Sequence, residues 1–324
     1  MYSGAKSRCT DECPPRHWFF PAFRAIYLCP ELFRLRQRLR PFAGGAANAE
    51  TDDSMQVKFW GVRGSTPTPQ VENLRYGGNT PCVEVRVNGR LYVFDCGTGF
   101  RILGKELMRE FAGSPIEAHI FLSHFHWDHI QGIPFFAPLY HRQSSFVFHA
   151  SERAGELRAT LEHHMDDPYF PVKMSNMAAR CSFHGIAEGS LRFDDCVVDS
   201  MWLNHPQGCL GFRLQAGNSV LVYATDNEPG DAVFDQAIRK FAQEADLLIY
   251  DAQYLPEEID SRRGWGHSHW REAVAVAKEA RIKHLVLFHH DPDRSDEGVD
   301  QLLAQARQHF PKVTAAAEGM TLQL

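Results

Sequence analysis

Four side chains able to bind a metal ion fall within six residues, in the run His124-Phe-His126-Trp-Asp128-His129. The run directly follows residues 120–123, an apolar segment with the composition of a β-strand. A loop at a strand end can turn its side chains toward one point, and imidazole nitrogens with a carboxylate suit a borderline cation such as Zn²⁺. The run therefore predicts a metal site, and the alternative is a loop of polar surface residues.

Three further apolar runs of strand composition also end near a residue that can bind a metal. These residues are His205, Asp226, and the adjacent pair His289 and His290. Each of them alone would more often be a loop histidine or a helix-capping aspartate. Four strands that all end in a histidine or an aspartate instead predict ligands that converge at one edge of the sheets, where α/β proteins usually place their site.

The order of these residues resembles that of the metallo-β-lactamase superfamily, with His-x-His-x-Asp-His, a later single His, a later Asp and a final His after a strand. The resemblance covers residues 55–324 and implies an α/β fold, the αββα four-layer sandwich of two mixed β-sheets flanked by helices. It also implies a dinuclear metal site between the sheet edges. One ion would be held by His124, His126 and His205, the other by Asp128, His129 and His289, with Asp226 bridging them.

The choice of the final ligand rests on strand geometry. His289 and His290 are adjacent, and strand alternation points their side chains to opposite faces. His289 directly follows the apolar strand, as the final ligand of the family does, and it is therefore preferred to His290.

Two features resemble the phosphodiesterase or tRNase Z-like branch of this superfamily. Asp226 stands in Tyr-Ala-Thr-Asp-Asn, whereas the β-lactamases themselves bridge their metals without this aspartate and often have a cysteine there. The run Gly266-His267-Ser268 resembles the His-Ser-Thr element of tRNase Z-like enzymes, with His269 in place of the usual Thr. The resemblance implies that His267 stabilises or protonates the leaving group. The alternative is a histidine at a helix N-terminus that Ser268 caps.

The resemblance also assigns supporting roles. Asp95, in Asp-Cys-Gly-Thr-Gly, is expected to orient metal ligands, and Asp251 to orient the histidine of the His-Ser-Thr-like element. Two glycine-containing runs resemble loops of bacterial members of the branch, where glycine lets the backbone approach a ligand closely. The candidate substrate-binding residues in these loops are Arg63, Ser65, Asn79 and Thr80, which are equally well explained as ordinary turn residues.

The implied chemistry is hydrolysis. Two divalent metal ions, Zn²⁺ first with Mn²⁺ or Fe as alternatives, would supply a metal-bridging hydroxide that attacks phosphorus in line. Asp128 and His267 are the expected catalytic residues of a metal-dependent phosphodiesterase acting on a small or cyclic phosphodiester. The alternatives are a hydrolase of carboxylic esters, thioesters or lactones, a tRNA 3′-processing endonuclease, and a metal-retaining biosynthetic accessory or binding protein.

Charge argues against a long nucleic acid as the substrate. The 324 residues include 34 Lys and Arg against 40 Asp and Glu, and residues 1–50 alone carry +4, which leaves −10 on the rest. Residues 151–184, where tRNase Z enzymes carry a basic arm, have a net charge of −1. Because polynucleotide affinity comes largely from Lys and Arg on phosphates, a small phosphodiester is the expected partner. The sequence is compatible with a homo-oligomer.

The chain is expected to divide into a leader and one domain. Residues 1–54 would be an N-terminal extension that is flexible or without structure, in which residues 32–40 could form a short basic amphipathic helix. Residues 55–324 would form one hydrolase domain. No stretch has the 18 or more consecutive apolar residues of a membrane span. Eight scattered cysteines fit reduced thiols in a cytoplasmic protein.

Short strands and helices are expected to alternate along this domain, with a hairpin turn at Asn88-Gly89 and Ser295 as a helix N-cap. The expected strands are 57–60, 82–87, 91–94, 119–123, 197–203, 220–225, 247–250 and 285–288. The expected helices are 101–111, 152–164, 231–241, 269–280 and 295–310.

Overall fold

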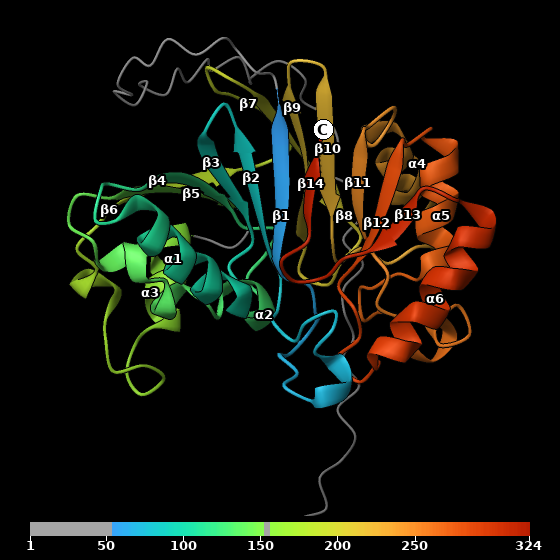
Figure 1. Ribbon diagram of the computed structural model, residues 1–324, viewed down its shortest axis with the longest axis horizontal. Helices are drawn as coiled ribbons and strands as arrows, with labels where there is room; N and C mark the ends of the chain where they lie inside the picture. Colours follow the sequence, from blue (N-terminus) through green and yellow to red (C-terminus); the bar gives the residue numbers. More distant parts are fainter. Residues whose placement is uncertain (1–53, 152–155) are drawn as a thin grey trace, which may run out of the picture. The chain divides into compact units, whose positions relative to one another are not determined.

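The computed structural model describes residues 54–151 and 156–324. The expectations for residues 1–53 lie outside the described residues, as does the start of the helix expected from residue 152. Two seven-stranded sheets form the centre of the described part, and helices cover their outer faces (Figure 1). The predicted αββα four-layer sandwich is confirmed.

The first sheet contains, in spatial order, β14 (Thr321–Gln323), β1 (Met55–Gly61), β2 (Cys82–Val87), β3 (Arg90–Phe94), β4 (Glu117–Phe121), β5 (Ser145–Ser151) and β6 (Arg180–Ile186). Its first four strands are antiparallel, and β3 to β6 run parallel. The predicted hairpin joins β2 to β3, and both Asn88 and Gly89 have the positive φ that a tight turn needs.

The second sheet repeats this mixed pattern. It contains, in spatial order, β13 (Val313–Ala315), β12 (His284–Phe288), β11 (Leu247–Asp251), β10 (Ser219–Ala224), β9 (Cys209–Ala216), β8 (Val197–Leu203) and β7 (Gly189–Arg192). Strands β7 to β10 are antiparallel, and β10 to β13 run parallel.

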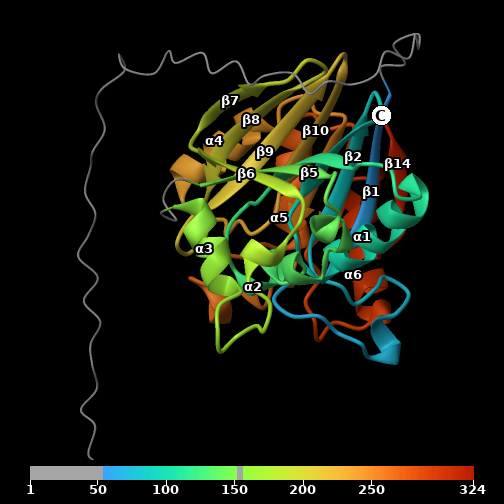
Figure 2. The same ribbon diagram turned by 90° about the vertical axis from the view of Figure 1, so that its left-hand side faces the viewer.

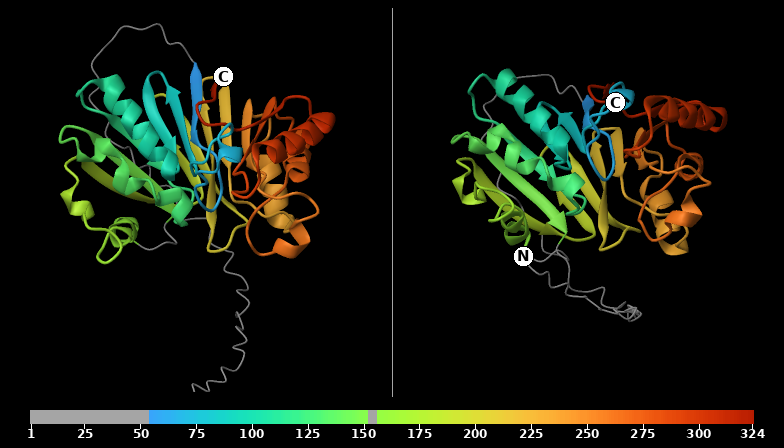
Figure 3. Two further views of the ribbon diagram at one scale, coloured as in Figure 1. Left: turned by 60° about the horizontal axis from the view of Figure 1, so that its bottom comes forward. Right: turned by 90° about the horizontal axis from the view of Figure 1, so that it is seen from below.

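The helices fall into two groups on opposite sides of the sheets, as the view from below shows (Figure 3). One group is α1 (Thr98–Phe111), α2 (Trp127–Ile130) and α3 (Leu157–His164), and the other is α4 (Ala232–Phe241), α5 (Trp270–Glu279) and α6 (Asp296–His309). Short 3₁₀ turns lie at Val71–Asn73, Ile133–Phe135, Ala137–Tyr140, Met174–Asn176 and Ile259–Arg262. Among the described residues, no helix combines the length and the apolar character that crossing a membrane requires.

Side chains at the starts of α4, α5 and α6 satisfy free backbone N–H groups there. Ser295 caps α6 as predicted, because its side chain accepts from the N–H of Gly298. The cap of α5 is His269, whose ring accepts from the N–H of Glu272. The interpretation of Ser268 as that cap is therefore wrong, since the helix begins one residue later than it requires.

Aromatic side chains fill the space between the sheets. Phe94 of β3 stacks on Phe121 of β4 with 5.4 Å between ring centroids, and on Tyr223 of β10 with 5.5 Å. All three rings are fully buried. Burial of side chains this large stabilises the fold by roughly 2 kcal/mol each, so the apolar interior holds the two sheets in a fixed relation.

The parallel strands of both sheets deliver their carboxyl ends to one edge of the sandwich. The residues found there include Asp95 after β3, His124 after β4, Asp226 after β10 and His289 after β12. Helix α2 lies at the same edge in two views related by 90° (Figures 1 and 2). The polar residues picked out from the sequence are thus brought together by strand direction.

Two histidines lie in the middle of β4 and β5, with His119 half-buried and His149 fully buried. Nδ1 of His119 lies 3.1 Å from Nε2 of His149, and the ring of His149 also stacks on Phe121 with 4.6 Å between centroids. Burial lowers the pKa of His119 to about 4 and that of His149 well below its usual range, because a charged ring would lose its hydration. Both rings are therefore neutral at pH 7.

This pair should make the metal-free protein less stable in mild acid. As the pH falls from 6.5 to 4, the unfolded chain protonates these two rings while the folded protein does not, so the free energy of unfolding decreases. In urea titrations, the decrease should be steeper for the wild type than for His119→Gln/His149→Gln, by up to about 1.4 kcal/mol per pH unit for each histidine. His163→Gln, at an exposed position, is the control. Equal slopes in wild type and double variant would contradict the buried neutral pair.

Candidate metal centre

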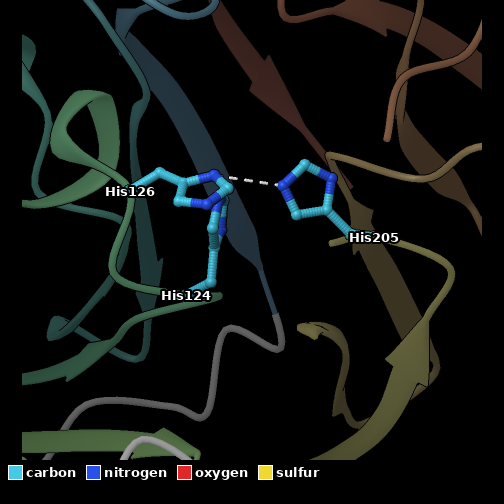
Figure 4. A group of neighbouring side chains, drawn as sticks. All are labelled: His124, His126 and His205. Atoms are coloured by element: carbon cyan, nitrogen blue, oxygen red, sulfur yellow. Dashed lines mark hydrogen bonds between the residues drawn. The ribbon is translucent and has the colours of Figure 1, made fainter. Parts of the chain in front are cut away.

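Three histidines from two separate loops converge at this edge (Figure 4). His124 and His126 lie between β4 and α2, and His205 lies between β8 and β9. One nitrogen from each ring can be chosen so that all three lie within 4.8 Å of one another. Nδ1 of His126 is 3.1 Å from Nε2 of His205, and the buried Nε2 of His124 has no hydrogen-bond partner among the described residues. These side chains form a first triad of potential ligands.

Hydrogen bonds hold the opposite side of these rings. His205 donates from Nδ1 to the carbonyl of Gly266 at 2.9 Å, and His124 donates from Nδ1 to Oγ of Ser123 at 3.0 Å. Each bond fixes the tautomer that leaves Nε2 with a free lone pair. Burial lowers the pKa of His124 well below its usual range and that of His205 to about 4, so both rings are neutral at pH 7.

A second triad joins Asp128 and His129 of α2 to His289, which follows β12. Nε2 of His289 lies 3.2 Å from Oδ2 of Asp128 and 3.3 Å from Nε2 of His129. His290 donates instead from Nε2 to the carbonyl of Ala316 at 2.9 Å. Of the two adjacent histidines, His289 is the one placed in a ligand group.

Asp226 lies between the two triads. Its Oδ2 is 3.4 Å from Nε2 of both His129 and His289, and its Oδ1 is 3.8 Å from Nε2 of His124 and 3.9 Å from Nε2 of His205. One carboxylate oxygen therefore faces each triad. Imidazole nitrogens and carboxylate oxygens grouped around two neighbouring points are a donor set that suits Zn²⁺ and similar ions. The residues fit two divalent ions, and all seven predicted ligands come together.

Asp95 supports this group from beneath. It is fully buried and accepts four hydrogen bonds: two from Ser123, through N and Oγ, one from Nδ1 of His129, all at 2.8 Å, and one from the hydroxyl of Tyr223 at 2.7 Å. A buried carboxylate is tolerated when its oxygens are hydrogen-bonded in this way. The contacts orient His129 and fix the start of the loop that carries the first two ligands.

His267 and Asp251 form a hydrogen-bonded pair beside Asp226. Nδ1 of His267 donates to Oδ2 of Asp251 at 2.8 Å, and Asp251 also accepts from the backbone N–H groups of Ser268 and Asp226 at 3.0 and 3.1 Å. Burial lowers the pKa of His267, but the negative charge of Asp251 and this hydrogen bond outweigh burial and raise the pKa to about 9. His267 is therefore protonated at pH 7 and can donate a proton.

A pocket of about 420 Å³ opens onto these groups. Of the four predicted substrate-binding residues, Ser65 lines it, and the N–H of Ser65 donates to Oδ2 of Asp128 at 2.7 Å. A volume of this size accommodates a nucleotide-sized ligand. The lining residues are Ser65, Phe125, His126, Trp127, Asp128, Asp226 and His267.

The other three predicted substrate-binding residues, Arg63, Asn79 and Thr80, do not line the pocket. Arg63 is fully buried, and its guanidinium donates to the backbone carbonyls of Gly77 at 2.8 Å and Arg294 at 2.7 Å. The side chains of Asn79 and Thr80 are hydrogen-bonded to other parts of the chain. These loops are expected from the sequence to face a ligand, but the side chains of Arg63, Asn79 and Thr80 instead hold the loops in place through hydrogen bonds within the protein.

Four residues of the centre have left-handed backbone conformations. They are Ser65, Asp95, Asp226 and His289, with φ of 61°, 60°, 55° and 61°. Such a conformation costs a residue other than glycine of order 1 kcal/mol or more, and it persists where the surroundings over-determine it. The turns that follow β3, β10 and β12 therefore have strained backbone conformations, which orient the side chains of Asp95, Asp226 and His289 toward the centre.

Gln253 contacts the centre in a way that the sequence did not reveal. Its Oε1 accepts from Nδ1 of His289 at 2.8 Å, and its Nε2 donates to Oγ of Ser65 at 3.3 Å. Because the N–H of Ser65 in turn donates to Asp128, Gln253 links two members of the second triad. A glutamine two residues after a strand has no distinctive spacing, so only its contacts identify it.

Comparison with known proteins gives consistent matches. The beta-lactamase superfamily domain matches residues 90–290. A Ribonuclease Z of Haloarcula marismortui is 25% identical, over 82% of this chain and 96% of its own. Two similar solved structures are the metallo-beta-lactamase fold protein YhfI from Bacillus subtilis (TM-score 0.63, 20% identity, 84% and 100% coverage) and human tRNase Z, short form (TM-score 0.59, 23% identity, 82% and 98% coverage). These structures share the fold of this chain.

The relatives correct one expectation drawn from charge. The prediction that a long nucleic acid is an unlikely substrate is wrong, because the relatives that match most of the chain are named Ribonuclease Z. Net charge averages over the whole surface, whereas divalent ions concentrate positive charge at the site itself. An acidic body is therefore compatible with a polynucleotide substrate.

A methyl group at position 266 should disturb the first triad. Gly266 has a φ of 88°, and a Cβ there would lie 2.1 Å from Nδ1 of His205. Gly266→Ala should therefore weaken Zn²⁺ binding by about 10- to 100-fold in chelator competition. Gly264→Ala is the matched control, because Gly264 has a φ of 84° and a Cβ there meets no atom within 4 Å. An equal loss in both variants would assign the effect to backbone strain alone.

Removing the amide of Gln253 should weaken the second triad. Gln253→Leu leaves Nδ1 of His289 without its acceptor, so the tautomer and the ring orientation are no longer fixed. We expect one of two Zn²⁺ ions to lose about 10-fold in affinity by isothermal titration, with the other unchanged. Gln215→Leu, at an exposed position of β9, is the control. Unchanged affinity for both ions in Gln253→Leu would show that the contact is dispensable.

Proposed function

The chain belongs to the beta-lactamase superfamily, and from this premise we propose that it is a zinc-dependent phosphodiesterase that cleaves RNA. That it is a metal-dependent hydrolase follows from its family and its relatives. The relatives named Ribonuclease Z, which align with more than four fifths of the chain, support an RNA substrate, and the processing of tRNA 3′ ends is the specific candidate. The catalytic domain would span residues 55–324.

The observation that carries the proposal is the position of His267. It lines the same pocket as Asp128 and Asp226, and its Nδ1 is 3.7 Å from Oδ1 of Asp226. Because Asp251 holds Nδ1, the ring would donate from Nε2, and a proton donor in the same pocket as two proposed metal ligands suits cleavage of a bond with a poor leaving group, such as the 3′-oxygen of a ribose. Hydrolysis of an activated thioester would not require it.

In this mechanism two Zn²⁺ ions, when bound, supply a deprotonated water as nucleophile and neutralise charge on the phosphate. The chain's own residues position the reaction. Asp251 binds Nδ1 of His267 and keeps the ring protonated and oriented, and His267 would donate the proton on Nε2 to the leaving oxygen as the phosphorus–oxygen bond breaks. The proposed ligands are His124, His126, His205, Asp128, His129, His289 and Asp226.

Replacement of His267 should separate catalysis from metal binding. In His267→Ala we expect hydrolysis of a 3′-extended RNA to fall by about 10²- to 10⁴-fold, because the leaving oxygen loses its proton donor. The metal content by elemental analysis should stay at about two ions per chain. His163→Ala, on an exposed part of α3, should have wild-type activity.

Two results would contradict the proposal. One is that the wild type, loaded with Zn²⁺, leaves both the RNA and bis(4-nitrophenyl) phosphate intact. The other is that it hydrolyses carboxylic esters or lactones with a rate that His267→Ala leaves unchanged, which would favour the ester hydrolase alternative.

A further inference from the structure

Two tryptophans of the described chain are exposed, and both lie next to residues of the metal centre. Trp127 is 77% exposed and Trp265 is 62% exposed, whereas Trp60, Trp202 and Trp270 are each at least 91% buried. Trp127 stands between two proposed ligands, and Trp265 stands two residues before the proposed proton donor. An indole is among the largest apolar groups in a protein and is usually covered for most of its area.

The exposure of Trp127 follows from its place in α2. The side chains of His126 and Asp128 belong to the ligand groups, and His129 and Ile130 are buried. Residue 127 therefore lies on the solvent-facing side of this helical turn. Neither the helix nor its packing needs a large apolar side chain at position 127, and a polar side chain would interact more favourably with water there. The indole therefore leaves a large apolar face uncovered at the mouth of the pocket.

The described residues that line the pocket include one phenyl and one indole ring but no Lys or Arg. Phe125 and Trp127 contribute the rings, and the other described residues that line it are histidines, aspartates and one serine. Bound divalent ions would account for contacts to a phosphate. Contacts to the rest of a substrate fall to the two rings, and a flat exposed indole matches the face of a nucleobase.

We propose that Trp127 is a stacking platform for the nucleobase next to the scissile phosphate, and this rests on the proposed function. The enzyme would thus hold single-stranded RNA through one stacked base and through the phosphate at the metal centre. Affinity would not depend on a row of Lys and Arg, which explains how a protein with an acidic body binds a polynucleotide. Stacking tolerates all four bases, so sequence selectivity at this position would be low.

Two kinds of ester with the same leaving group test the proposal. Thymidine 5′- and 3′-(4-nitrophenyl) phosphate carry a base, and methyl 4-nitrophenyl phosphate carries none. Trp127→Ala should raise KM for one or both thymidine esters by roughly 5- to 100-fold, with kcat little changed. The methyl ester should be hydrolysed as by the wild type. Trp127→Phe should restore most of the affinity and Trp127→Leu should not, because a ring rather than apolar bulk is required.

Trp265→Ala is the matched control, since it removes an indole that is also largely exposed but does not line the pocket. Equal KM values for the thymidine and methyl esters in the wild type would overturn the proposal. So would an equal rise of KM in Trp127→Ala and Trp265→Ala. A loss of turnover of the methyl ester in Trp127→Phe would also overturn it, because Trp127 would then act through its neighbouring ligands.

A binding measurement separates this proposal from the proposed function. Adenosine 5′-monophosphate should quench the intrinsic fluorescence of the Zn²⁺-loaded wild type more than that of Trp127→Phe. Such quenching without hydrolysis of any ester would reject the phosphodiesterase and support the platform. Hydrolysis without any difference in quenching would reject the platform alone.

The salt dependence of RNA binding independently tests whether Lys and Arg contacts to phosphates supply the affinity. Binding of a 12-nucleotide single-stranded RNA should weaken less than about fourfold between 50 and 200 mM KCl, because few phosphates meet a Lys or Arg. A decrease of a hundredfold or more would show that a basic surface dominates binding and would overturn the proposal.

Discussion

The carboxylate of Asp95 is the interaction on which the rest of the centre depends. It follows a strand of the first sheet, and it accepts from Tyr223 in the second sheet and from Ser123 and His129 in the loop and helix that carry ligands. Burying a carboxylate this deeply costs free energy unless its oxygens accept hydrogen bonds. The three donor residues and Asp95 therefore stabilise one another's positions. The same hydrogen bonds therefore join the two sheets and orient the proposed metal ligands.

Asp251 plays the corresponding part on the second sheet. It binds the backbone on both sides of the centre, at Asp226 and at Ser268, and it holds the ring of His267. The two buried aspartates differ in what they orient, since Asp95 holds a potential metal ligand and Asp251 the proposed proton donor. Both lie at the carboxyl ends of parallel strands, where the chain leaves the sheet and its backbone N–H groups are free to bond.

The sequence predicted those features that local pattern determines. A strand followed at once by His or Asp is visible in the sequence, and strand direction then brings His205, Asp226 and His289 to one edge. Gln253 was missed because its role comes from contacts with residues 36 and 188 positions away. Arg63 was misplaced for the same reason, since its acceptors include a carbonyl 231 positions away. Edge strands such as β13 and β14, with three residues each, are too short to show a period.

Each triad draws its members from both sheets, and this has a consequence for folding. The chain between His126 and His205 spans 79 positions, and that between His129 and His289 spans 160. Two bound ions would close both of these loops, as cross-links do, and restrict the unfolded chain far more than the folded one. Metal affinity would then be part of the folding free energy, and the stability of the protein would depend on the concentration of the metal it binds.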